Sequence, residues 1–168
     1  MLGQGDILKD EESLYKMFKF AENKKLDLLL HGYQAFDANI DDNIELIQRN
    51  AYPDNCYVYN SKNKNKIIKY RVLYGDVVCG ASVLYKTEAI RKYINIIKNK
   101  VRYIEDSTIM FMVLDKINCG YLDDNILLYE CGDGISTKSE LSKKFIDDLQ
   151  TIQPILEDFM KKNNDSYI

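Results

Sequence analysis

The sequence is poor in the residues that bind transition metals. It has one histidine, His31, and four cysteines at positions 56, 79, 119 and 131, and no two of these cysteines form a CxxC pair. A structural zinc site usually needs four His or Cys ligands, often paired at short spacing, so no zinc site is expected. The cysteines are scattered through apolar stretches, which predicts free, buried thiols in a reducing compartment.

Long apolar runs and a secretory signal pattern are also lacking, so neither a membrane-spanning helix nor export is expected. The net charge of −3 at pH 7 excludes a global positive field that would hold nucleic acid. Lysines cluster in residues 61–69 and 91–100, and we interpret these as a solvated loop and a solvated helix face. Weak attraction to anionic lipid head groups is the alternative. We therefore expect a cytoplasmic protein with at most peripheral contact at the inner face of the membrane.

The 168 residues, of which 46% are hydrophobic, suffice for the core of one domain. A first helix is predicted by apolar side chains at helical spacing, namely Leu14, Met17, Phe18 and Ala21. Residues 26–36 follow it, and their unbroken run of leucines is typical of a strand buried on both faces. A helix followed by a buried strand predicts an α/β sheet.

The next part of the chain is harder to divide. Residues 38–70 are polar, with Pro53 and a lysine-rich tract at residues 61–66, and predict a long excursion holding one short strand or helix. After it, Thr87 is predicted to cap a helix that carries isoleucine and tyrosine at helical spacing.

The last third predicts a helix, a strand and a helical tail. The helix opens at Glu105 and is stopped by Gly120, and an apolar strand covers residues 121–130. A helical tail is predicted from residue 138 onward, where Pro154 kinks or restarts it.

Three segments stand in a characteristic order along these elements. Met-Leu-Gly-Gln-Gly-Asp at residues 1–6 precedes the first helix, and Gly80-Ala81-Ser82 precedes an apolar run and a capped helix. The third segment begins with Ile-Glu-Asp at residues 104–106, which opens a helix, and ends after Gly120 and the next strand with Tyr-Glu-Cys-Gly-Asp-Gly-Ile-Ser-Thr at residues 129–137. This order resembles the C-terminal, acceptor-side half of family 2 glycosyltransferases, which have the GT-A fold.

The resemblance implies an α/β fold, a partial GT-A-like (Rossmann-like) mixed sheet flanked by helices that lacks the N-terminal nucleotide-binding strands. Residues 1–137 would form the acceptor-side domain, and residues 138–168 a helical tail packed on it or extending from it. The exposed sheet edge would then be covered by a second copy in a homodimer, by a separate chain, or by the rest of a longer protein.

The implied activity is transfer of a sugar from a nucleotide-sugar donor to a glycan acceptor of the cell surface, with inversion. Asp106 would be the catalytic base, and Glu105 would orient groups or contact the acceptor. Such a transfer needs a base at the acceptor hydroxyl, and a helix N-terminus favours the ionised carboxylate. The alternative is that Asp106 only caps its helix, because aspartate is a favoured N-cap residue.

Two further groups of residues are implied to bind substrate. Gly80, Ala81 and Ser82 would line the acceptor pocket, and Ser136 and Thr137 would reach a donor phosphate. Small residues where a strand packs against a helix explain the first group equally well, and a simple glycine-rich turn explains the second.

The sequence departs from the family pattern at its beginning. Gly3 and Gly5 stand where two aspartates of the family bind a divalent cation, Mg²⁺ or Mn²⁺, and only Asp6 remains as a metal ligand. This departure favours a second hypothesis, a non-catalytic remnant of the fold that binds a glycan or a partner. A third hypothesis, an unrelated α/β domain, predicts Asp6 and Asp106 on opposite sides of the molecule.

Overall fold

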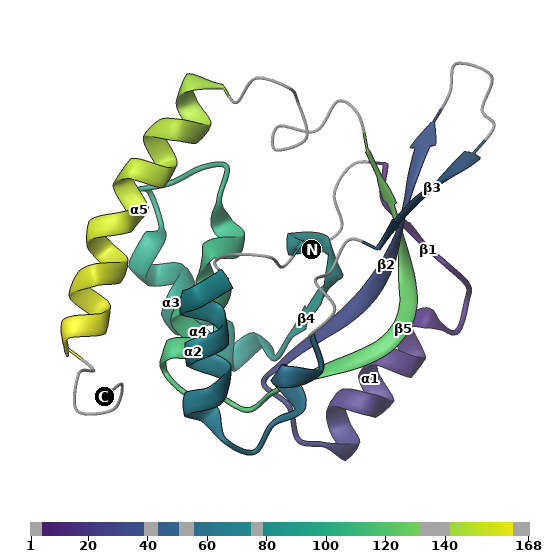
Figure 1. The fold of residues 1–168 in the computed structure, drawn as a ribbon, viewed down its shortest axis with the longest axis horizontal. Coiled ribbons are helices and arrows are strands. Elements are labelled where there is room, and N and C mark those ends of the chain that lie inside the picture. Colours follow the sequence, from purple (N-terminus) through teal and green to yellow (C-terminus); the bar gives the residue numbers. More distant parts are fainter. Residues whose placement is uncertain (1–4, 39–43, 51–55, 75–78, 132–141, 163–168) are drawn as a thin grey trace.

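The computed structural model describes residues 5–38, 44–50, 56–74, 79–131 and 142–162 of the chain. In these residues a curled, five-stranded mixed sheet lies between helix α1 on one face and helices α2 to α5 on the other (Figure 1). The α/β class predicted from the sequence is therefore confirmed. No helix in these ranges combines the length and apolar character needed to cross a bilayer.

Two long parallel strands form the centre of the sheet. Strand β2 (Leu28–Ala38) pairs with β5 (Cys119–Glu130) along almost its whole length. The short strand β1 (Ile7–Leu8) is antiparallel to β5. On the other edge of β2, β4 (Val83–Tyr85) pairs with its beginning and β3 (Ile44–Asn50) with its end, both antiparallel. The strands predicted at residues 26–36 and 121–130 are thus confirmed.

The leucines of β2 explain why it is the central strand. Leu28, Leu29 and Leu30 are completely buried. Because side chains alternate along a strand, Leu28 and Leu30 enter the larger core, whereas Leu29 packs with Met17 and Ile126 beneath α1. A strand with both faces buried needs apolar residues at every position, which is the pattern of the sequence.

The sheet is irregular opposite Gly32. His31 pairs with Leu122, but Gly32 pairs with Asn125, so Asp123 and Asp124 lie outside the regular pairing. A Cβ on Gly32 would lie 2.7 Å from the Asn125 side-chain oxygen and 2.8 Å from the Asp124 carbonyl oxygen. Glycine is therefore required where the bulge of β5 approaches β2.

The helices cover both faces of the sheet. Helix α1 (Ser13–Asn23) lies on one face, and its predicted position is confirmed. The other face is covered by α2 (Lys64–Tyr74), α3 (Thr87–Ile97), α4 (Thr108–Leu114) and α5 (Lys143–Lys162). Side chains of all four of these helices meet Leu28 and Leu30 in the larger core.

The inward face of α1 differs from the predicted one. Leu14 and Phe18 are 55% and 53% exposed, whereas Ser13 and Met17 are buried, and Phe20 and Ala21 pack against the small core beneath the helix. The apolar stripe of this helix is wider than the surface that the sheet offers it.

Two predicted helix boundaries are wrong. Thr87 is the first residue of α3, the N-cap position is Lys86, and no side chain caps this end. Helix α4 ends at Leu114 rather than near Gly120, because Lys116 takes a left-handed φ of 57° and Ile117 N–H donates back to Met112. Gly120 lies in β5 instead.

Residues 38–70 hold more structure than the sequence predicts. They contain β3, the 3₁₀ turn η1 (Cys56–Asn60) and most of α2, which begins inside the lysine-rich tract. Ile67, Ile68 and Arg71 of this helix are buried, while its lysines face outward or lie at its edge.

The C-terminal helix α5 packs onto the helical layer. Ile152 is 5% exposed within the larger core, and the rings of Phe111 and Phe159 meet edge to face at 5.1 Å. Pro154 lies inside the helix, which continues past it. Residues 138–141 and 163–168 of the predicted tail lie outside the described residues.

Candidate functional site

Asp106 lies in a short 3₁₀ turn, η3 (Glu105–Ser107), directly before α4. Ile104 and Ser107 are buried on either side of the pair, Glu105 is exposed and Asp106 is half-buried. The N-cap position of α4 is Ser107, and no side chain caps it, so the capping interpretation of Asp106 is wrong. The Thr108 hydroxyl donates to the Glu105 carbonyl at 2.9 Å and fixes the turn from behind.

Gly80 lies directly against the Asp106 side chain. A Cβ on Gly80 would lie 3.0 Å from Asp106 Cβ and 3.2 Å from its Oδ2. Gly80 begins the 3₁₀ turn η2 (Gly80–Ser82), in which Ala81 is half-buried and Ser82 is completely buried. The Ser82 hydroxyl donates to the Cys79 carbonyl at 2.9 Å and closes this turn. The structure therefore brings together the second and third segments singled out in the sequence.

Asp6 lies directly before β1 and contacts the end of β5. Glu130 N–H donates to Asp6 Oδ1 at 3.4 Å. Gly5 precedes Asp6 with a φ of 93°, and a Cβ there would overlap the Glu130 carboxylate. Glu130 thus places its carboxylate beside the N-terminal turn, in the space that a side chain at position 5 would enter.

Cys79 joins the two acidic regions. Burial, with the nearby carboxylates of Asp6 and Asp106, raises the pKa of the Cys79 thiol to about 11 from its ordinary value of 9.0. Asp6 and Asp106 thus both lie within electrostatic range of the Cys79 thiol.

The fit of a divalent cation depends on Asp6 and Glu130. Across the described ranges, no three His, Cys, Asp or Glu side chains gather into a metal site. Mg²⁺ in nucleotide-dependent enzymes is often held by one or two carboxylates together with substrate phosphates, so two carboxylates match that smaller requirement.

The structure does not test the remaining predicted residues. Ser136, Thr137 and Gly3 lie outside the described residues. No role for Cys79 or Glu130 was predicted from the sequence, because the contact of Glu130 with Asp6 and the place of Cys79 next to Gly80 and Asp106 join distant parts of the chain. The sequence could have indicated a role for Glu130 only through its position at the end of an apolar strand, and that position alone is a weak sign of a functional residue.

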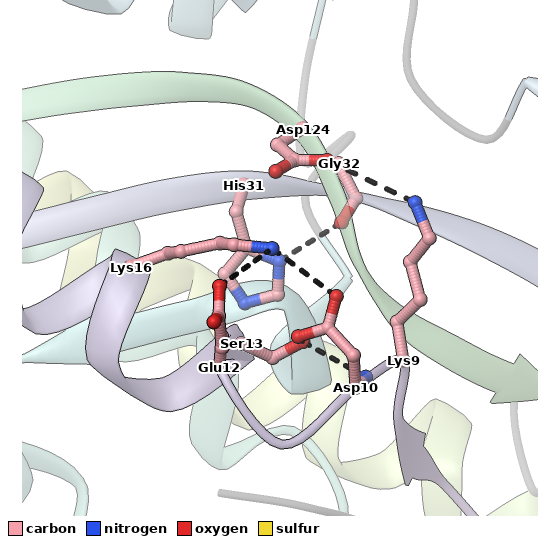
Figure 2. Close-up of polar contacts among 8 residues, drawn as sticks. All are labelled: Lys9, Asp10, Glu12, Ser13, Lys16, His31, Gly32 and Asp124. Carbon is pink, nitrogen blue, oxygen red and sulfur yellow. Dashed lines mark hydrogen bonds and ion pairs between the residues drawn. The ribbon is translucent and has the colours of Figure 1, made fainter.

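A separate polar cluster surrounds the single histidine on the α1 face of the sheet. His31 is 1% exposed, and its Nδ1 lies 2.9 Å from the Gly32 carbonyl oxygen. Figure 2 shows the ring beneath the N-terminal turn of α1, where Lys16 contacts Asp10 and Glu12. Burial lowers the pKa of His31, so the neutral imidazole is the form that the fold holds.

No protein-family model, curated protein or solved structure matches the chain.

Proposed function

We propose that the chain is a glycosyltransferase, or part of one, in which Asp106 is the catalytic base. The observation that carries the proposal is the close contact of Asp106 with Gly80, next to Cys79, whose pKa is raised by burial and also by Asp6 and Asp106. Three segments far apart in the sequence, each with a role in the GT-A pattern that the chain resembles, supply these residues.

The proposed reaction is a direct displacement at the sugar. The Asp106 carboxylate accepts the proton of an acceptor hydroxyl while the hydroxyl oxygen bonds to the anomeric carbon of the donor sugar. The bond between this carbon and the diphosphate breaks, and the nucleoside diphosphate leaves with the electron pair. The configuration inverts because the attack comes from the side opposite the leaving group.

The absence of a side chain at Gly80, beside the proposed base, suits this chemistry. Because Gly80 has no side chain, the Asp106 carboxylate rests on the backbone of η2, and an acceptor can approach the same surface closely. The buried Ser82 hydroxyl holds that turn in shape through its bond to the Cys79 carbonyl.

A divalent cation would be held by Asp6, with Glu130 as the second carboxylate. In that position the ion would neutralise charge on the donor diphosphate. Glu130 would then replace the carboxylate that glycine lacks at position 5. This assignment predicts that binding of a nucleoside diphosphate depends on Mn²⁺ or Mg²⁺.

One observation favours the second candidate, a non-catalytic remnant that binds a glycan or a partner protein. Gly5 has a left-handed φ, and the Glu130 carboxylate fills the space beside it. An aspartate at this position would be strained and would collide with Glu130. The backbone at position 5 therefore requires glycine, and an aspartate could not be restored there without a rearrangement of Glu130.

Calorimetric titration with nucleoside diphosphates, with and without Mn²⁺, separates the two candidates. We expect Mn²⁺-dependent heat for at least one of the common nucleotides, and loss of that heat in Asp6→Asn. Asp147→Asn is the matched control, because Asp147 is an exposed carboxylate on α5. Silence with every nucleotide would leave the remnant as the better account.

The base assignment has its own test in whichever form of the protein shows transfer. Asp106→Asn keeps the size of the side chain but removes the proton acceptor, so transfer should fall by about 10²- to 10⁴-fold while nucleotide binding persists. Turnover close to that of the unchanged protein would show that another group is the base.

A further inference from the structure

Helix α5 contacts the segment that leads into the Asp106 turn. Asp148 Oδ2 accepts two hydrogen bonds from consecutive backbone groups, from Arg102 N–H at 2.7 Å and from Tyr103 N–H at 2.6 Å. Both distances are short, as expected when the acceptor is a carboxylate. The Asp148 carboxylate thus binds the backbone of the bend at Arg102 and Tyr103, although α5 lies more than 40 residues away in the sequence.

The bend that Asp148 grips lies immediately before the candidate base. Tyr103 is followed by the buried Ile104 and then by Glu105 and Asp106. Beyond them, Thr108 fixes the Glu105 carbonyl, and Gly80 contacts the Asp106 side chain. The turn that carries Asp106 is therefore fixed by Thr108 on one side and by Gly80 on the other. Asp148 fixes the backbone that leads into this turn.

Asp148 is itself held firmly. It lies one helical turn before Ile152, which is 5% exposed in the larger core, so both project from the same face of α5. The Phe111–Phe159 ring contact fixes the same helix further along. Because Phe111 belongs to α4, the helix that carries Asp148 is also bound to the helix that follows Asp106.

We propose that Asp148 is a positioning residue, which sets the place of the Asp106 carboxylate against Gly80 by holding the bend at Arg102 and Tyr103. This inference rests on the proposed function for the role of Asp106, but the clamp itself can be tested without any activity. It makes the C-terminal helix α5 a part of the functional site.

The first test uses the Cys79 thiol as a reporter of Asp106. The pH dependence of alkylation by iodoacetamide is followed on the Cys79 peptide by mass spectrometry, in the full chain. Asp106→Asn should lower the apparent pKa of Cys79, and Asp148→Ala should lower it in the same direction because the carboxylate moves away. Asp148→Asn keeps a hydrogen-bond acceptor and should restore the original value, and the exposed neighbour Asp147→Ala should leave it unchanged.

An unchanged Cys79 profile in folded Asp148→Ala would overturn the proposal, and so would failure of Asp148→Asn to restore it. If Asp148→Ala does not fold, amide hydrogen exchange in the unchanged protein decides. We expect slow exchange at Arg102 and Tyr103, and exchange as fast as in an unstructured peptide would refute the clamp.

Activity provides a third readout that separates this inference from the proposed function. Where a donor is turned over, Asp148→Ala should lower kcat by about 10- to 100-fold with nucleotide affinity unchanged, because a small misplacement of a catalytic group is costly. Loss of affinity with kcat unchanged would contradict a positioning role. Calorimetric silence with all nucleotides would remove the proposed function but leave the Cys79 result standing.

Discussion

Replacing Gly32 with alanine should destabilise the sheet more than any other glycine-to-alanine change in its interior. The new Cβ would lie 2.7 Å from the Asn125 side-chain oxygen and 2.8 Å from the Asp124 carbonyl oxygen. The second of these belongs to the backbone of the β5 bulge, so it moves only if the pairing of β2 and β5 is disturbed. Overpacking of this kind costs about 1–3 kcal/mol or more.

Gly120→Ala is the matched control, since Gly120 is also buried in the β2–β5 pair. There the closest atoms are Leu26 Cδ1 at 2.8 Å and Cδ2 at 3.2 Å, the far end of a flexible side chain that can rotate away. Both substitutions gain about 0.4–1 kcal/mol because alanine reduces the freedom of the unfolded chain. We therefore expect a net loss of about 2 kcal/mol for Gly32→Ala and less than about 1 kcal/mol for Gly120→Ala.

Urea denaturation of both variants beside the unchanged chain measures the difference directly. A loss of about 2 kcal/mol corresponds to a fall of about 4–8 °C in Tm for a protein of this size. Equal stability of Gly32→Ala and Gly120→Ala would refute this prediction, because a rigid backbone neighbour would then cost no more than a movable methyl group.

Three further predictions concern other parts of the molecule. Burial lowers the pKa of His31 below its ordinary value of 6.5 in the folded chain. As the pH falls below 6.5, His31 therefore becomes protonated in the unfolded chain before it does so in the folded chain. The free energy of unfolding falls with pH from about 6.5 down to the pKa of the folded state. Urea denaturation should show that the stability difference between the unchanged chain and His31→Gln shrinks by up to about 1.4 kcal/mol per pH unit in that range. An equal stability difference at pH 7.5 and at pH 5.5 would contradict the prediction. Ser107→Ala should stabilise the protein or leave it unchanged within about 1 kcal/mol, because the Ser107 hydroxyl is buried without a hydrogen-bond partner among the described residues, and a clear loss in thermal denaturation would reveal a partner. Phe111→Ala should cost about 3–5 kcal/mol and loosen α5, since the ring is completely buried against Phe159, and faster proteolysis within α5 would report the loosening.

The elements that the sequence predicted well are those with a strong local signal. The unbroken leucines of β2, the apolar run of β5 and the helical spacing in α1 and α3 each fix an element by its own residues. One short strand or helix was predicted within residues 38–70, but the position and length of α2 were not, because lysines and asparagines surround its start and Arg71 interrupts its buried apolar face. A buried guanidinium is read as a surface residue unless its surroundings are known.

The candidate site was predictable only in part. The order of three motifs was enough to select Asp106, Gly80 and Asp6, and the structure places Asp106 against Gly80 and both carboxylates within electrostatic range of Cys79. Glu130 and Asp148 carry no local pattern that separates them from other surface acids. Their roles arise from the overlap of Glu130 with the space beside Gly5 and from two backbone hydrogen bonds to Asp148, which link parts of the chain distant in sequence.

The parallel pairing of β2 with β5 also governs how the chain can fold. About 90 residues separate Leu28 from its partner Cys119, so the central pair of the sheet cannot close until a long loop has been brought together. Contacts of such high sequence separation slow folding relative to helical proteins of equal length. During synthesis on the ribosome, the edge of β2 that pairs with β5 remains unpaired until β5 has been made. This leucine-rich edge is therefore the part of the nascent chain most exposed to aggregation and to binding by chaperones.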